Sequence, residues 1–199
     1  MQVETKTDLV DWDQFDLMLV ATDNPEPVIA LFPPETGLPC IHHKWNPVGP
    51  TSKQFIERKL RENSRLSLGI IPNPSLPQPD DWGTKPEHLN KRGKPKMWGA
   101  SNKHIASSKL IWVEGDGGLN IQDQYSIIRE AFLLKPSFLI WSGSKSLHAY
   151  WRLSESISPT KFKEWQQRIS SQLSLYSSDF GSDEGLNNAC RVMRCAGGL

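Results

Sequence analysis

Apolar and polar residues alternate most regularly between residues 146 and 153. Every second residue of this segment is apolar: Leu147, Ala149, Trp151 and Leu153. Between them come Ser146, His148, Tyr150 and Arg152. Successive side chains of a strand point to opposite faces, so the pattern predicts one buried face and one open face.

The same kind of pattern predicts the other elements. We expect strands at residues 16–22, 28–32, 65–71 and 137–141 and another beginning at residue 110, with a short one at 190–194. Helical spacing predicts helices at 51–60 and 121–134, and one that begins at Ser158-Pro159. A long loop is expected at 72–101, where five prolines within 72–86 precede a basic cluster. We see no internal repeat.

The order of these elements predicts an α+β fold. From residue 110 onward it is strand, helix, strand, strand, helix and short strand, which favours an RRM-like, mostly antiparallel sheet backed by helices on one face. We expect an N-terminal α/β lobe at 1–105 and this second half at 106–199, packed together as one unit. The open face of its sheet would carry Glu114, Asp116, Ser146 and His148.

The amino-acid composition excludes some classes of protein but does not indicate a function. The 199 residues include 23 lysines and arginines and 22 acids, a net charge of +1, so any nucleic-acid contact must depend on local charge. The three cysteines have no CxxC spacing, which argues against a zinc ribbon and is typical of a reducing cytoplasm. No apolar run is long enough for a membrane span. We expect a cytoplasmic protein with no membrane partner.

Two carboxylates one residue apart are the strongest chemical signal. Glu114 and Asp116 follow an apolar run and precede Gly117-Gly118. In a strand they share a face about 7 Å apart, and like charges held so close repel unless a cation lies between them. The pair therefore predicts a divalent-metal site suited to phosphate chemistry, with solvated acids at a strand end as the alternative.

A turn of small residues precedes the alternating strand. Its amides, with the hydroxyls of Ser142 and Ser146 and the ammonium of Lys145, could cradle a triphosphate. His148 could donate to a phosphate oxygen. The same residues also suit an ordinary hairpin turn with an exposed histidine.

Further candidates lie near the end of the chain. Asp183 could complete the metal shell, with Asp179 as a weaker competitor, and Arg191 or Arg194 could clamp phosphates. In an extended strand the two arginines would face opposite ways, so one of them would reach the site. Surface salt bridges would explain these residues nearly as well. The basic cluster contains Lys85 and four residues that could contact a template backbone or simply be solvated: Lys91, Arg92, Lys94 and Lys96.

Taken in order, these motifs resemble the archaeo-eukaryotic primase superfamily. The acid-x-acid pair, the Ser146-x-His148 pair and Asp183 followed by Arg191-Val192-Met193-Arg194 are similar to its primase-polymerases and to RepB-type primases of bacteria, phages and plasmids. The resemblance spans about residues 110 to 194. Glu114 stands where family members more often have Asp.

The resemblance implies primer synthesis or extension on single-stranded DNA from nucleoside triphosphates, with two Mg²⁺ or Mn²⁺ ions. Glu114, Asp116 and Asp183 would hold the metal. The nucleotide would contact a larger set of residues: Ser142, Lys145, Ser146, His148, Arg191 and Arg194. It also implies a role in plasmid or phage replication, with a helicase domain or partner in a longer parent protein.

Two other functions remain open from the sequence. A non-catalytic RRM-like module would bind single-stranded nucleic acid through Trp112, Tyr150 and basic residues. A rolling-circle replication initiator would use Tyr150 as nucleophile with His42 and His43. That class needs two histidines separated by one residue on a strand face, which this pair does not provide.

Overall fold

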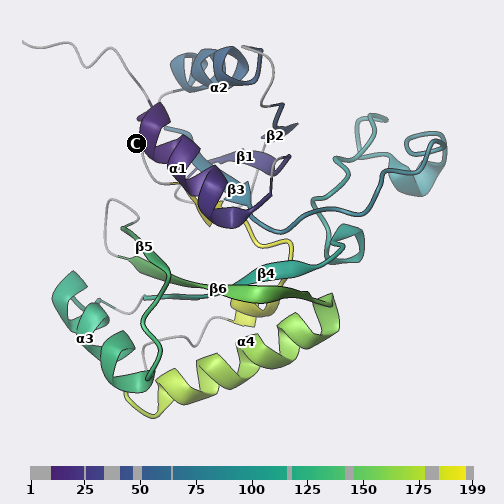
Figure 1. The fold of residues 1–199 in the computed structure, drawn as a ribbon. Coiled ribbons are helices and arrows are strands. Elements are labelled where there is room, and N and C mark those ends of the chain that lie inside the picture. The colour runs from purple at the N-terminus through teal and green to yellow at the C-terminus, as the bar shows by residue number, and fades with distance from the viewer. Residues whose placement is uncertain are drawn as a thin grey trace, which may run out of the picture.

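Two antiparallel sheets with helices outside them form the architecture (Figure 1). The structure is a computed structural model, and it describes residues 10–24, 26–33, 41–46, 51–63, 65–115, 118–141, 146–177 and 184–195. Among these residues no helix combines the length and the apolar character that crossing a bilayer would require.

The first sheet has four strands in the order β2-β1-β3-β7. They are β1 (Val28–Phe32), β2 (Ile41–Lys44), β3 (Ser67–Ile71) and β7 (Met193–Arg194). β7 comes from the end of the chain, and its Met193 lies opposite Ile70 of β3. A short last strand is present over the last two residues of the predicted 190–194, and it pairs in the first sheet rather than in the sheet that precedes it in the sequence.

Two helices accompany this sheet. α2 (Thr51–Glu62) confirms the helix predicted at 51–60. The strand predicted at 16–22 is wrong, because these residues belong to α1 (Trp12–Thr22). The Asp11 side chain caps α1 by accepting a hydrogen bond from the backbone N–H of Gln14. Phe15, Met18 and Thr22 are its buried residues, and they recur at helical spacing.

The second sheet has the strand order β4-β6-β5. Its strands are β4 (Ser108–Glu114), β5 (Phe138–Trp141) and β6 (Leu147–Ile157). α3 (Ile121–Ala131) and α4 (Pro159–Ser174) lie on the side of this sheet away from the first one (Figure 1). Ser158 caps α4 by accepting from the N–H of Lys161, as the Ser-Pro signal predicts. The predicted α+β class, with an antiparallel sheet backed by helices, is confirmed.

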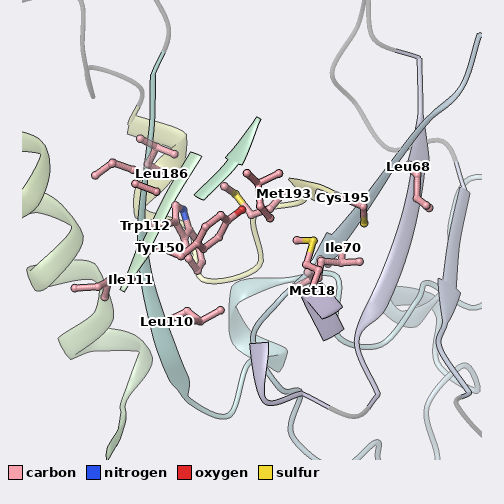
Figure 2. Close-up of a cluster of buried hydrophobic side chains, with 14 of the residues drawn as sticks. Met18, Leu68, Ile70, Leu110, Ile111, Trp112, Tyr150, Leu186, Met193 and Cys195 are labelled. Atoms are coloured by element: carbon pink, nitrogen blue, oxygen red, sulfur yellow. The ribbon is translucent and has the colours of Figure 1, made fainter. Parts of the chain in front are cut away.

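The expected open face of the second sheet is not open. Trp112 and Tyr150 are completely buried, and Figure 2 shows them between β4 and the side chains of Met193 and Cys195. One continuous apolar core includes residues of both sheets. A sheet with nothing packed on one face leaves that face in solvent, and its strands then alternate between apolar and polar residues. Here the first sheet and the segment that leads to β7 cover the face of the second sheet that was expected to be open.

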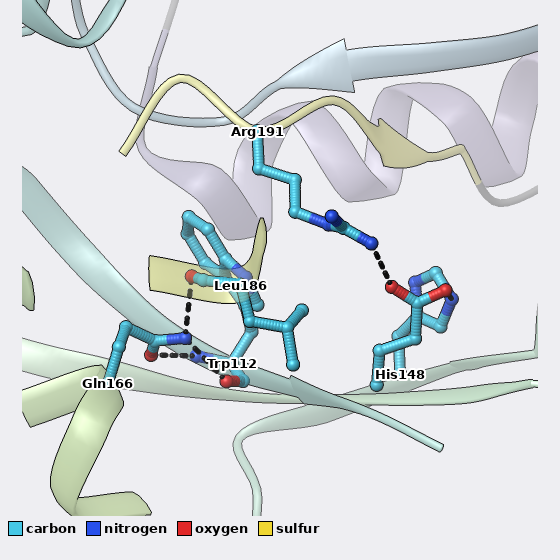
Figure 3. Close-up of polar contacts among 6 residues, drawn as sticks. Trp112, His148, Gln166, Leu186 and Arg191 are labelled. Carbon is cyan, nitrogen blue, oxygen red and sulfur yellow. Dashed lines mark hydrogen bonds and ion pairs between the residues drawn. The ribbon is translucent and has the colours of Figure 1, made fainter. Parts of the chain in front are cut away.

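Gln166 of α4 closes the free edge of β4. Its side-chain amide accepts from the backbone N–H of Trp112 (3.1 Å) and donates to the carbonyl oxygens of Trp112 (2.9 Å) and Leu186 (3.1 Å). Figure 3 shows these bonds, which join β4 to η3 (Glu184–Asn187). Gln166 is buried, so it satisfies backbone groups that water does not reach.

We expect Gln166→Leu to lower the free energy of unfolding by about 2–4 kcal/mol, because it leaves three buried backbone groups without a partner. Urea denaturation measures the change. The neighbouring Gln167 is exposed, so Gln167→Leu is the matched control and should change stability by less than about 0.5 kcal/mol. Equal effects of the two substitutions would show that the edge contact is not important.

A long excursion separates β3 from β4, as predicted for residues 72–101. It contains the short helices η1 (Pro86–His88) and η2 (Asn102–His104). Much of it extends sideways from both sheets (Figure 1). Its two ends are held together by a bridge between Ser75 and Ile105.

Candidate active site

Three side chains from distant parts of the sequence meet at the end of the second sheet. Glu114 is the last residue of β4, and the strand register places it directly opposite His148 of β6. Side chains opposite each other in an antiparallel pair point to the same face. Arg191 reaches the same place from the segment between η3 and β7 (Figure 3).

Both oxygens of Glu114 contact nitrogen atoms. Nη2 of Arg191 donates to Oε2 at 3.0 Å, and Nε2 of His148 lies 3.4 Å from Oε1. The His148 side chain is 2% exposed and that of Glu114 is 21% exposed. The Arg191 side chain is 26% exposed, so Glu114 and Arg191 are the parts of this group that solvent, or a ligand, reaches.

Glu114 remains ionised over a wide pH range. Burial alone would raise its pKa, but the imidazole of His148 and the guanidinium of Arg191 outweigh burial and lower the pKa from its ordinary 4.5 to about 2. A metal ligand must be deprotonated, so Glu114 meets the first requirement for holding a divalent cation.

This pKa shift has a consequence for acid stability. A depressed pKa in the folded protein contributes stability that is fully present above pH 4.5 and is lost as the pH falls toward 2. We therefore expect the stability difference between the wild type and Glu114→Gln to shrink by up to about 3 kcal/mol over that range. Urea denaturation of both proteins at several pH values measures it. A difference that is independent of pH would contradict the ion-pair assignment.

Several buried polar atoms of β4 and β6 make no hydrogen bond with the described residues. Neither ring nitrogen of His148 makes a hydrogen bond with the described residues, and the same holds for the Tyr150 hydroxyl and the Trp112 indole N–H. Burial, with Glu114 and Cys195 nearby, raises the pKa of Tyr150 well above its ordinary value. His148 therefore has a donor that the described residues do not use, although solvent does not reach the ring in this structure.

The other predicted site residues have varied outcomes. Ser146 was expected on an open face but is buried. Arg191 contacts Glu114, and Arg194 lies in β7 opposite Gly69. Asp116, Asp183, Ser142 and Lys145 lie outside the described residues, as does Asp179. The four basic residues suggested for template contact are exposed in the excursion and do not belong to the group around Glu114: Lys91, Arg92, Lys94 and Lys96.

Metal binding is not visible from the described part of the chain alone. Within it, no group of three His, Cys, Asp or Glu side chains is arranged to hold an ion. A metal site that included Glu114 would need further acids from outside the described residues, and Asp116 and Asp183 remain the candidates that the sequence offers.

The contact between Arg191 and Glu114 was not predicted. The sequence suggested a phosphate contact for Arg191, and the two residues are 77 positions apart. Gln166 was also missed, because a glutamine in the middle of an amphipathic helix gives no sign that it faces a strand edge.

The arrangement of sheets and helices is similar to that of two solved domains, one from a primase-polymerase and one from a ligase. A cyanophage S-2L primase-polymerase domain is similar over 96% of this chain and 84% of its own, with a TM-score of 0.64 and 20% identity. The polymerase domain of Mycobacterium tuberculosis ligase D, solved with DNA, is similar over 98% of this chain and 81% of its own, with a TM-score of 0.50 and 14% identity. No protein-family model and no curated protein sequence matches the chain.

The aromatic residues on which both alternative functions relied are buried. Base stacking needs an accessible ring face, and Trp112 and Tyr150 are each 0% exposed. The same burial removes Tyr150 as a nucleophile for DNA nicking. His43 contacts the Ser52 hydroxyl and stacks on Phe55, which accounts for it as a packing residue.

Proposed function

We propose that the protein is a template-directed nucleotidyltransferase that makes or extends primers on single-stranded DNA. The observation that carries this proposal is the meeting of Glu114, His148 and Arg191 at one end of the second sheet. A carboxylate kept ionised beside an imidazole and a guanidinium suits a reaction in which cations and phosphates meet. The likeness to primase-polymerases in fold supports the same class.

In the proposed reaction a primer 3′-hydroxyl attacks the α-phosphate of an incoming nucleoside triphosphate and pyrophosphate leaves. Glu114, Asp116 and Asp183 are the residues that would hold Mg²⁺ or Mn²⁺. When bound, such ions lower the pKa of the attacking hydroxyl and neutralise charge on the leaving oxygens. The protein contributes by positioning the reactants and by electrostatic stabilisation.

The remaining residues act on the phosphates. His148 donates a hydrogen bond to a phosphate oxygen, and the turn with Ser142, Lys145 and Ser146 supplies amides, hydroxyls and an ammonium. Arg191 would exchange its Glu114 partner for a phosphate oxygen, which would leave the carboxylate free to hold a cation. This exchange keeps every charge paired, because the ligand brings both the cation and the anion that replace the ion pair.

A primer-synthesis assay tests the proposal. The protein is incubated with single-stranded DNA, labelled nucleotides and Mn²⁺, and short labelled products are expected. Ribo- and deoxynucleotides are supplied in separate reactions, with and without a preformed primer. Absence of products in every reaction, from protein that is folded by circular dichroism, would refute the proposed activity.

A further inference from the structure

The excursion between β3 and β4 contains one local structure twice. Residues 82–88 read Trp-Gly-Thr-Lys-Pro-Glu-His, and residues 98–104 read Trp-Gly-Ala-Ser-Asn-Lys-His. Both segments end in a single turn of 3₁₀ helix, η1 or η2, whose last residue is the histidine. The sequence therefore does contain a short repeat, Trp-Gly-x₄-His, contrary to our expectation.

Equivalent residues of the two copies make equivalent contacts. The backbone N–H of Gly83 donates to Nδ1 of His88 at 3.3 Å, and that of Gly99 donates to Nδ1 of His104 at 3.2 Å. Both glycines have positive φ, 94° and 88°. A side chain at either position would be strained, so the turn requires glycine.

Each copy also holds a neighbouring segment in the same way. The Trp82 indole N–H donates to the carbonyl of Lys96, whose own N–H donates to the carbonyl of His88. In the second copy Trp98 and His104 make these two bonds to Leu76. The segment held by the first copy leads directly into Trp98, so the two copies interlock.

The four rings pack together and brace the excursion. Trp82 stacks on His88 with ring centroids 4.1 Å apart, and Trp98 stacks on His104 at 3.9 Å. The two pairs meet edge to face, with 4.7 Å between the centroids of Trp82 and Trp98. The segment from residue 81 to residue 105, here named the arm, thus has a small core of its own.

The tip of the arm is a tight turn between Asn90 and Lys94. The Asn90 side chain accepts from the N–H groups of Arg92 (2.8 Å) and Lys94 (3.2 Å), and the N–H of Asn90 donates to the carbonyl of Lys94 (2.8 Å). Gly93 adopts φ 70° with open space around it. The backbone of the turn is fixed, while its side chains face solvent.

Three cations at this tip have no acidic partner. Lys91, Arg92 and Lys94 are exposed, and no carboxylate of the described residues forms an ion pair with them. Other cations of the arm are engaged, since Lys85 pairs with Asp81 (2.8 Å) and Lys96 donates to the carbonyl of Glu87 (2.9 Å). A braced turn that carries three unpaired like charges is suited to a polyanion with regularly spaced charges.

We infer that the arm binds the phosphate backbone of the single-stranded template through Lys91, Arg92 and Lys94. The identity of the polyanion rests on the proposed function. The arm joins the second sheet at the Ser108 end of β4, about 20 Å from Glu114 at ~3.3 Å per strand residue. The arm therefore grips the template several nucleotides away from the reacting end.

Fluorescence anisotropy with labelled single-stranded DNA tests this inference without catalysis. Lys91→Ala/Arg92→Ala/Lys94→Ala should weaken binding about ten- to a hundredfold at ~0.1 M salt, and the slope of log K against log salt should fall by about 2. The control, Lys135→Ala/Lys163→Ala/Arg168→Ala, removes three exposed charges elsewhere and should change neither quantity by much. Equal behaviour of the two triple variants would overturn the inference.

A second comparison identifies the ligand and separates this inference from the proposed activity. Duplex DNA and vesicles of anionic lipid are offered to the same proteins, and a tip effect on vesicles but not on DNA would overturn the assignment to nucleic acid. If the protein makes no primers but its DNA binding depends on the tip residues, the proposed activity is refuted and the inference about the arm still holds. If the protein makes primers but the tip variant binds DNA as the wild type does, the inference about the arm is refuted and the proposed activity still holds.

Discussion

Glu114→Gln should lower nucleotide incorporation by at least about 10³-fold. The amide keeps the shape of the side chain but removes the charge that would hold a divalent cation, and Glu114 is the ionised carboxylate that the structure places beside His148 and Arg191. Asp116→Ala should have an effect of similar size. Single-turnover extension of a labelled primer with saturating nucleotide and Mn²⁺ measures both.

Glu155→Gln is the matched control for this substitution. Glu155 is exposed on β6 of the same sheet, so its loss of charge should leave extension unchanged. The template affinity of Glu114→Gln should stay within about threefold of the wild type, because the carboxylate is not expected to touch the template. Normal extension by Glu114→Gln would remove the metal assignment.

His148→Ala should reduce kcat/KM for the incoming nucleotide by about 10²-fold, the cost of losing one donor to a charged phosphate. Its effect on template affinity should be small. The imidazole is buried opposite Glu114, with Nε2 3.4 Å from Oε1 but without a hydrogen bond to the described residues. We expect a nucleotide phosphate to take up this donor when the site is occupied.

A purely structural role for His148 has to be separated from this one. His148→Leu fills the volume that alanine leaves empty, and it should lose nucleotide use as severely while keeping more of the stability. His42→Ala, a half-buried histidine of β2, is the control and should keep full activity. Unchanged kcat/KM in His148→Leu would refute the phosphate contact.

Most of the fold could be predicted because strong local patterns agree with it. The Ser158-Pro159 signal and the alternation from residue 146 predicted where α4 and β6 begin, although β6 continues to Ile157 beyond the predicted end at Leu153. The strand predicted at residues 16–22 was wrong because Leu17 and Val20 are apolar but exposed, at 69% and 72%. These two residues fill the gaps between the buried positions of the helix, so the segment has the continuous apolar pattern of a strand. Exposed apolar residues are common, and they weaken periodicity in short segments.

The partners of Glu114 could be predicted only in part. Strand alternation placed Glu114 and His148 on one face, and the register confirms it. Their burial and the contact with Arg191 depend on how the two sheets pack and on β7 crossing to the first sheet, which no local pattern encodes. The arm was recognised as a basic loop, but the role of its two tryptophans emerged only from their contacts with His88 and His104.

A crystal structure with Mn²⁺ and a non-hydrolysable nucleoside triphosphate tests the central claim most directly. Anomalous scattering locates manganese independently of the protein atoms. We predict manganese within about 2.5 Å of carboxylate oxygens of Glu114, Asp116 and Asp183, with His148 on a phosphate oxygen. Manganese bound elsewhere, with Glu114 still paired to Arg191 and the other two acids far away, would contradict the account.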